Sequence, residues 1–186
     1  MNRARIVSMR HIVSAVLILG ASDSFAQFQK KIEIPDWDNA VRFELVASQS
    51  PVRPGDTFEL ALLADIQEGY HLYGPEEPEP TRTAVSVQGN ALKAGKPTYP
   101  PVIQRELEGL GSYNLYEGPI VIRVPVTLAT DFKGKSVEAP IEVAYQLCTD
   151  FACSAPSTRV LSVTLPGAAT GTEVKKLHPS VFNKKK

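Results

Sequence analysis

A strict alternation of apolar side chains near the C-terminal end of the sequence constrains the fold most. Every second residue from 137 to 147 is apolar, and glutamate and glutamine occur among the residues between them. The apolar members are Val137, Ala139, Ile141, Val143, Tyr145 and Leu147. Because successive side chains of a β-strand point to opposite faces, this pattern predicts a strand with one buried and one solvated face.

Shorter stretches repeat the pattern and are separated by turn residues. We expect further strands at residues 41–47, 58–64, 70–73, 83–87, 120–128 and 158–165. The sequence contains 15 prolines and 12 glycines, and no stretch keeps the period of an amphipathic helix over three turns. These features predict an all-β protein, an antiparallel β-sandwich of roughly seven to nine strands with little helix.

The first 26 residues are typical of a cleavable signal peptide. Three arginines precede an apolar run at residues 12–21, and small residues stand at the positions before an expected cleavage after Ala26. A retained N-terminal anchor is the less favoured alternative, because the apolar run is short for a membrane span. We divide the remainder into a lead-in at 27–40 that can dock through Trp37, a domain at 41–166 and a flexible C-terminal tail at 167–186.

The charge of the chain argues against a nucleic-acid partner. The 20 basic and 20 acidic residues cancel, and removal of the predicted signal, with three arginines and one aspartate, leaves a net charge near −2. No later apolar stretch is long enough to cross a bilayer. We therefore expect the exported chain to be soluble and not inserted in a membrane.

The two cysteines, Cys148 and Cys153, are the candidate functional site. In an exported protein such a pair is expected to form a disulfide. A ring of six residues adds only about 2 kcal/mol to stability, so a structural clip and a redox pair both remain open on these grounds. A zinc or copper site is disfavoured, because His71 and His178 are the only histidines left after the signal.

Local charge favours slow chemistry at this pair. Asp150 is the only charged residue between the two cysteines, and a carboxylate disfavours a neighbouring thiolate. If the pair is redox-active, we expect partner-assisted exchange and no strongly activated nucleophile.

Three motifs in order carry a family resemblance. They are Gly69-Tyr70-His71-Leu72-Tyr73, then Leu115-Tyr116-Glu117-Gly118 before the apolar run 120–126, then Tyr145-Gln146 with Cys148, Cys153 and Pro156. Together they span roughly residues 41–165 and resemble the N-terminal periplasmic domain of DsbD-type thiol:disulfide interchange proteins.

The resemblance implies an immunoglobulin-like antiparallel β-sandwich in the periplasm whose two cysteines shuttle between disulfide and dithiol without a cofactor. Cys153 would form the mixed disulfide with a partner and Cys148 would resolve it, although the reverse order stays open. The full-length family continues into a membrane domain and a thioredoxin-like domain that this sequence lacks. We therefore expect a free-standing module, a possible component of a protein-disulfide reductase. Thioredoxin-like proteins and a separate membrane electron transporter would be its partners.

The family also shields its cysteines with a cap loop, which maps here to residues 107–113. Leu110 or Tyr113 would replace the usual aromatic shield, and Tyr73, Tyr116 and Phe151 are further candidates for cap or partner contacts. Tyr73 and Tyr116 also suit simple packing on a sheet. For His71 we expect a surface or hydrogen-bonded strand residue without acid–base work.

The alternative function comes from a different class. A secreted β-sandwich that binds other proteins, as an adhesion or chaperone-type module, would need the disulfide only as a local structural clip.

Overall fold

The computed structural model describes residues 34–107 and 111–183, and they form an antiparallel β-structure. The strands are β1 (Val41–Ala47), β2 (Gln49–Ser50), β3 (Thr57–Ile66), β4 (His71–Tyr73), β5 (Ala84–Val87), β6 (Leu92–Ala94), β7 (Ile103–Leu107), β8 (Gly111–Tyr116), β9 (Pro119–Leu128), β10 (Ser136–Tyr145), β11 (Leu147–Cys148), β12 (Ser157–Pro166) and β13 (Lys175–Lys176). One short helix, α1 (Pro179–Phe182), follows.

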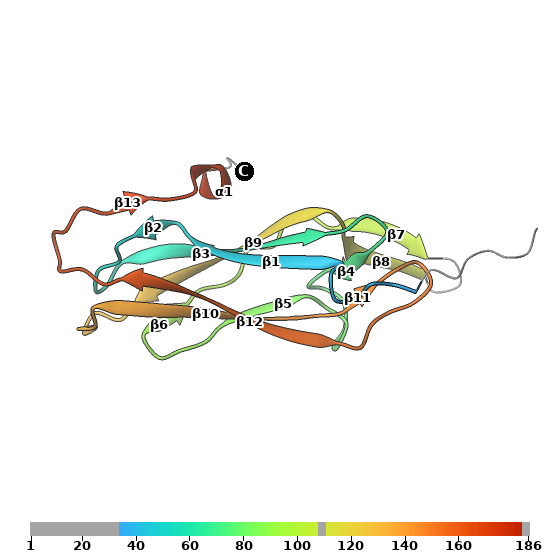
Figure 1. Cartoon of the computed structure of the whole chain (residues 1–186), viewed down its shortest axis with the longest axis horizontal. Helices are drawn as coiled ribbons and strands as arrows, with labels where there is room; N and C mark the ends of the chain where they lie inside the picture. Colours follow the sequence, from blue (N-terminus) through green and yellow to red (C-terminus); the bar gives the residue numbers. More distant parts are fainter. Residues whose placement is uncertain (1–33, 108–110, 184–186) are drawn as a thin grey trace, which may run out of the picture. The chain divides into compact units, whose positions relative to one another are not determined.

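Two sheets form the layers of a sandwich. One has the strand order β1-β3-β9-β6 and the other the order β12-β10-β5, and in Figure 1 β1 and β3 lie above β10 and β12. Strand β1 lies beside β12 and β6 lies beside β5, so the layers approach each other at both edges. The predicted all-β, immunoglobulin-like sandwich with little helix is confirmed.

Alternating side chains fill the space between these layers. In β10, every second residue is buried, and Ala139, Ile141 and Val143 have no exposed surface. Strand β9 repeats the pattern, with Ile122, Val124 and Val126 each 1% exposed. The 2.0-residue period of the sequence is therefore the period of the core, which we call the main core.

A third sheet, with the order β11-β4-β8-β7, carries the cysteines, and we call it the cysteine sheet. Strands β7 and β8 form a hairpin in which Ile103 pairs with Leu115 and Arg105 pairs with Tyr113. Strand β11 continues from β10 after one residue and pairs with β4. The cysteine pair therefore stands directly on the end of the best-patterned strand.

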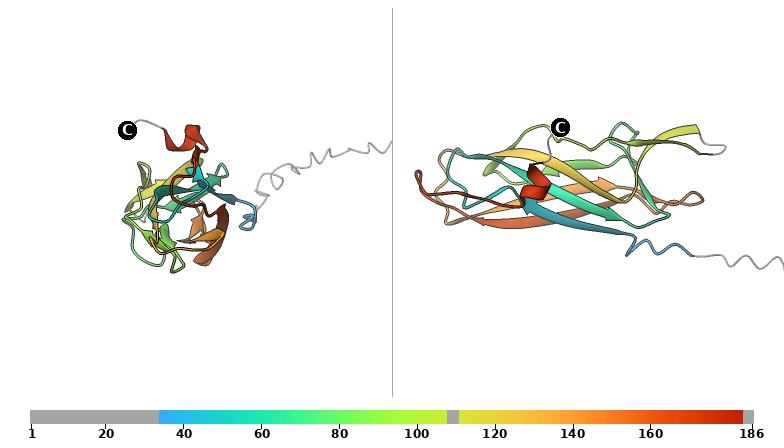
Figure 2. Two further views of the ribbon diagram at one scale, coloured as in Figure 1. Left: turned by 90° about the vertical axis from the view of Figure 1, so that its left-hand side faces the viewer. Right: turned by 90° about the horizontal axis from the view of Figure 1, so that it is seen from above.

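Residues 167–183 follow a defined path, whereas composition favoured a flexible tail over 167–186. Strand β13 of this segment pairs with β2, and helix α1 lies outside the layer that contains β3 (Figures 1 and 2). The side chain of Arg123, on β9, donates two hydrogen bonds to the carbonyl oxygen of Val181. Backbone pairing and this cation together hold the segment against the sandwich.

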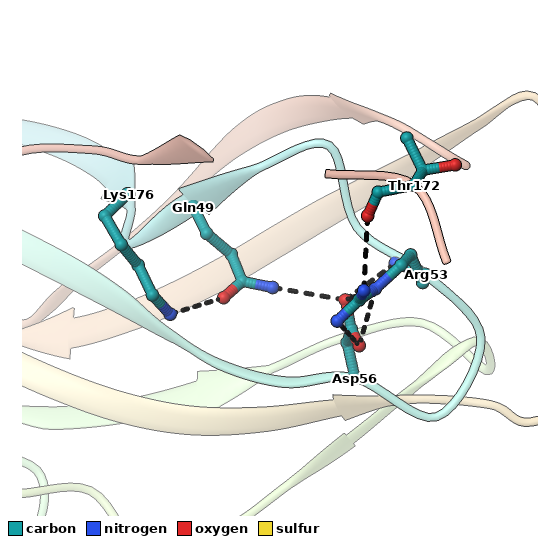
Figure 3. Close-up of polar contacts among 5 residues, drawn as sticks. All are labelled: Gln49, Arg53, Asp56, Thr172 and Lys176. Atoms are coloured by element: carbon teal, nitrogen blue, oxygen red, sulfur yellow. Dashed lines mark hydrogen bonds and ion pairs between the residues drawn. The ribbon is translucent and has the colours of Figure 1, made fainter. Parts of the chain in front are cut away.

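A chain of polar contacts supports the same segment (Figure 3). Lys176 Nζ donates to Gln49 Oε1 at 2.9 Å, and Gln49 Nε2 donates to Asp56 Oδ2 at 3.3 Å. Arg53 pairs with Asp56 at 3.1 Å and donates to the carbonyl of Thr172 at 3.2 Å. Burial alone raises the pKa of Asp56, but the hydrogen bonds and charge of Arg53, with the charge of Lys176, lower the pKa overall.

Within residues 34–107 and 111–183, no helix has the length and apolar character that a membrane crossing needs.

Candidate redox site

The two cysteines are joined by a disulfide that closes a tight loop after β11. Their Cα atoms lie 4.0 Å apart, and the two residues form an isolated antiparallel bridge. Inside the loop, the backbone N–H of Thr149 donates to the carbonyl of Ala152 at 2.8 Å. The Thr149 hydroxyl oxygen accepts bonds from the backbone N–H groups of Phe151 and Ala152 at 3.3 and 3.2 Å. Three backbone N–H groups of the loop are therefore satisfied within it.

The two cysteines of the disulfide differ in solvent exposure. Cys148 has no exposed surface, because it belongs to a strand of the cysteine sheet, whereas Cys153 is exposed. Between them, at the tip of the loop, the ring of Phe151 is 93% exposed. A reactant from solution therefore reaches Cys153 and meets an apolar ring beside it.

The register of the cysteine sheet places a set of side chains on the face that carries Cys148. Cys148 pairs with His71, and Leu115 pairs with Tyr73. Directly paired residues of antiparallel strands share a face, and so do residues two apart in one strand. This face therefore carries His71, Tyr73, Arg105, Tyr113, Leu115 and Cys148. We call it the site face, and the opposite face points into the main core.

An apolar cluster surrounds Cys148 on the site face. Tyr73 and Leu115 are buried beside it at 8% and 0% exposure, and the half-buried Tyr113 packs on them. The rings of Tyr73 and Tyr113 meet edge-on with centroids 5.6 Å apart. Two of the residues suggested as cap or partner contacts therefore lie at the buried cysteine.

Of the remaining suggested residues, Phe151 lies at the loop tip and Tyr116 is not brought to this cluster. Tyr116 points into the main core, is 1% exposed and donates its hydroxyl to the carbonyl of Pro100 at 3.1 Å. Burial is the largest cause that raises the pKa of Tyr116 to about 12. The one-residue offset from Leu115 explains this placement, since neighbours on a strand face opposite ways. Leu110 lies outside the described residues.

Arg105 links the hairpin to the cysteine loop, and the sequence alone did not point to it. Its guanidinium contacts Asp150 Oδ1 at 3.0 Å and forms a second ion pair with Glu117. Both ion pairs are partly exposed, so each adds little stability. Asp150, whose carboxylate was expected to disfavour a nearby thiolate, is therefore paired with the guanidinium of Arg105.

A groove of about 610 Å³ opens next to this ion-pair cluster. Arg105, Glu117 and Asp150 line it together with Tyr70 and the turn at residues 67–69. The groove is therefore polar on the side that adjoins the cysteine loop.

His71 differs from the sequence-based expectation of a surface or hydrogen-bonded residue. It is 1% exposed, its Nε2 atom has no hydrogen-bond partner among the described residues, and its ring meets Tyr73 edge-on at 5.7 Å. Burial and then the nearby charge of Arg105 lower the pKa of His71, against smaller opposite effects of Asp150 and Glu117. The alternation of His71 with Tyr73 was the available signal, because it places both rings on one face.

The described part of the chain has no group of three or more histidine, cysteine, aspartate or glutamate side chains placed to hold a metal ion.

Comparison with known proteins identifies one family. The model of the family "Thiol:disulfide interchange protein DsbD, N-terminal" matches residues 40–165. A comparison with curated protein sequences finds no match.

Solved structures of low sequence identity were also found. The reduced DsbD N-terminal domain of Neisseria meningitidis is 16% identical, with a TM-score of 0.38 over 72% of this chain and 90% of that one. The N-terminal periplasmic domain of ScsB from Proteus mirabilis is 11% identical, with a TM-score of 0.47 over 73% of this chain and 49% of that one. A complex of the DsbD and PilB N-terminal domains from Neisseria meningitidis gives 16% identity, a TM-score of 0.39 and coverage of 73% and 88%.

Proposed function

This chain belongs to the family of N-terminal domains of the thiol:disulfide interchange protein DsbD, and from that premise we propose that its cysteines relay electrons between periplasmic proteins. The disulfide would accept two electrons from one dithiol partner and pass them to the disulfide of another. The matched range, residues 40–165, includes both cysteines and every residue of the site face. The exposure of Cys153 beside the buried Cys148 is the observation that carries the proposal.

The exposure difference suggests an order of events. A partner thiolate attacks the sulfur of Cys153, the sulfur–sulfur bond to Cys148 breaks, and Cys148 leaves as a thiolate. A second thiol of the partner then attacks the partner sulfur of the mixed disulfide and releases Cys153. The partner becomes a disulfide, and the domain is now in its dithiol form. Delivery to a client runs the same steps in reverse, with Cys153 as attacking group and Cys148 as resolving group. Cys148 is unsuited to the first attack because it has no exposed surface.

We further propose where the partner binds. The exposed ring of Phe151 is suited to an apolar depression next to the active site of a thioredoxin-like partner, and the polar groove beside Asp150 borders the same contact. Tyr73 and Tyr113 would pack against Cys148 and fix its position. Leu110 belongs to the proposed cap. One structure of low similarity holds the DsbD and PilB N-terminal domains in complex. For this chain we propose thioredoxin-like partners and a separate membrane electron transporter.

The first test is the equilibrium reduction potential of the Cys148–Cys153 disulfide in the protein without residues 1–26, the proposed signal peptide. A potential of roughly −180 to −270 mV, the range of exchange proteins, is expected. A potential below about −300 mV would identify a structural clip and would favour a binding module instead. The Phe151→Ala variant is the matched control, because a change at the loop tip should alter partner binding and leave the potential unchanged.

A further inference from the structure

We propose that His71 exchanges a proton with Cys148 each time the disulfide opens or closes. This inference rests on the proposed function, because it assigns a task only if the two cysteines cycle. It concerns the buried half of the pair, for which the exchange steps above give no source or acceptor of protons.

The placement of His71 supports this role. It is the direct partner of Cys148 between β4 and β11, so the two side chains leave the sheet on the same face with Cβ atoms roughly 4.5–5.5 Å apart. Both residues are buried, at 1% and 0% exposure. The two side chains are therefore neighbours in an environment with little water.

The unpartnered ring nitrogen of His71 is a second, independent observation. A buried polar atom without a hydrogen-bond partner lowers stability and calls for an explanation. Nε2 is such an atom in the disulfide form, among the described residues. The disulfide form of Cys148 carries no proton, but its reduced form is a thiol that can donate one. Reduction therefore places a hydrogen-bond donor, the Cys148 thiol, opposite the unpartnered nitrogen of His71.

Cys148 needs such a partner because of its burial. The thiolate is the attacking species, and a buried thiol in apolar surroundings holds its proton more strongly than an exposed one. Tyr73 and Leu115 pack directly around Cys148. A neutral imidazole on the same face is the nearest base that the paired strands supply.

Charged and titratable groups face His71 from each element that packs around it. They are Tyr73 on the same strand, Tyr113 on β8, Arg105 on β7, Glu117 after β8, and Asp150 with Cys148 from the cysteine loop and β11. Burial and Arg105 lower the pKa of His71, and the two carboxylates oppose this effect. Since the ordinary value is 6.5, the imidazole is free to accept a proton at pH 7.

The proton balance closes in both directions. During delivery, Cys148 passes its proton to His71, and its thiolate attacks the sulfur of Cys153 in the mixed disulfide. The bond between Cys153 and the client breaks, and the client sulfur leaves with the electron pair. The imidazolium then returns its proton to the client thiolate or to water. During acceptance, the partner thiol releases its proton to solvent as its sulfur attacks Cys153, His71 takes up a proton from solvent, and the imidazolium passes that proton to the departing Cys148 thiolate.

The test follows the two halves of one turnover separately. Reduced protein is mixed with the aromatic disulfide DTNB, which releases one coloured thiolate when Cys153 attacks and a second when Cys148 closes the ring. We expect His71→Gln to slow the second release at least tenfold at pH 7 and to leave the first unchanged. The wild-type rate of the second release should rise with pH through an inflection below 6.5, and this inflection should vanish in the variant. His178→Gln, the same change at an exposed histidine, is the matched control and should behave as wild type.

The possible failures are distinct. If wild-type protein gives no second release, the cysteines do not cycle, and the proposed function fails together with this inference. If the wild type gives both releases and His71→Gln matches its rate and pH profile, only the role of His71 is refuted.

A measurement on wild-type protein covers the case in which His71→Gln does not fold. NMR titration of the His71 ring should show, in the reduced protein, an inflection shared with the Cβ resonance of Cys148. The disulfide form should lack this shared inflection. Identical His71 titration curves in the two redox states would overturn the inference.

Discussion

Reduction of the Cys148–Cys153 disulfide should weaken the fold only modestly. The bond closes a ring of six residues, since the cysteines are five positions apart. The chain-entropy model for such a ring gives about 2 kcal/mol at 25 °C. A domain of this size has a typical stability of about 5–15 kcal/mol, and its main core does not depend on the bond. The reduced protein should therefore stay folded, as a redox relay requires.

Urea unfolding of the oxidised and reduced protein measures this difference. Trp37 is the only tryptophan and packs edge-on against Tyr70 at 5.8 Å, so its fluorescence reports unfolding. The oxidised protein should be more stable by about 2 kcal/mol, with equal denaturant slopes. By the thermodynamic cycle, the folded disulfide should then be about 40 mV harder to reduce than the same pair in the unfolded chain.

A Cys148→Ala, Cys153→Ala double variant is the third protein to compare in these unfolding measurements. It should lose about 1 kcal/mol more than the reduced protein, because truncation of the buried Cys148 leaves a small void beside Leu115. Loss of more than about 5 kcal/mol on reduction alone, or unfolding, would refute the reasoning and would make the bond a structural staple.

Three further predictions address other parts of the molecule. Phe151→Ala should slow exchange with a protein partner but not with a small thiol, because the exposed ring contacts only large partners; stopped-flow kinetics with both reductants tests this, and equal slowing would contradict it. Arg105→Met should raise the pKa of His71, although burial still lowers it, because a facing cation is lost; an unchanged NMR titration would refute this. Wild-type protein should lose stability as the pH falls below about 3.8 through the lowered pKa of Asp56, since the contribution of that carboxylate is present only above this range. Asp56→Asn should flatten this acid limb in urea titrations, and an unaltered limb would show that Asp56 is not its source.

The sandwich could be predicted because its long strands carry their own pattern. Residues 136–145 form one strand in which buried residues alternate with exposed or half-buried ones, as the sequence pattern predicts. The hairpin of β7 and β8 could not be predicted in this way, and the strands expected from the sequence do not include it. Gln104, Arg105 and Glu106 interrupt the alternation, because β7 is an edge strand with a solvated side.

The candidate site was only partly visible for a related reason. The cysteines are close in sequence, so their pairing needed no knowledge of the fold. The site face depends on the register between β4, β8 and β11, which come from distant parts of the chain. Composition does not reveal that register. The burial of His71 and the position of Arg105 therefore emerged only from the strand pairing.

The strands of the cysteine sheet limit which mutations this protein can tolerate. Residues of the site face and of the main core are interleaved along the same short strands, with Leu72 between His71 and Tyr73. Substitutions can therefore modify one set without the other. Deletion of a single residue within β4 would turn the core residue toward the cysteines and the site residues into the core. Redox properties can accordingly be tuned by point mutation, whereas short insertions and deletions in these strands should destroy function and folding together.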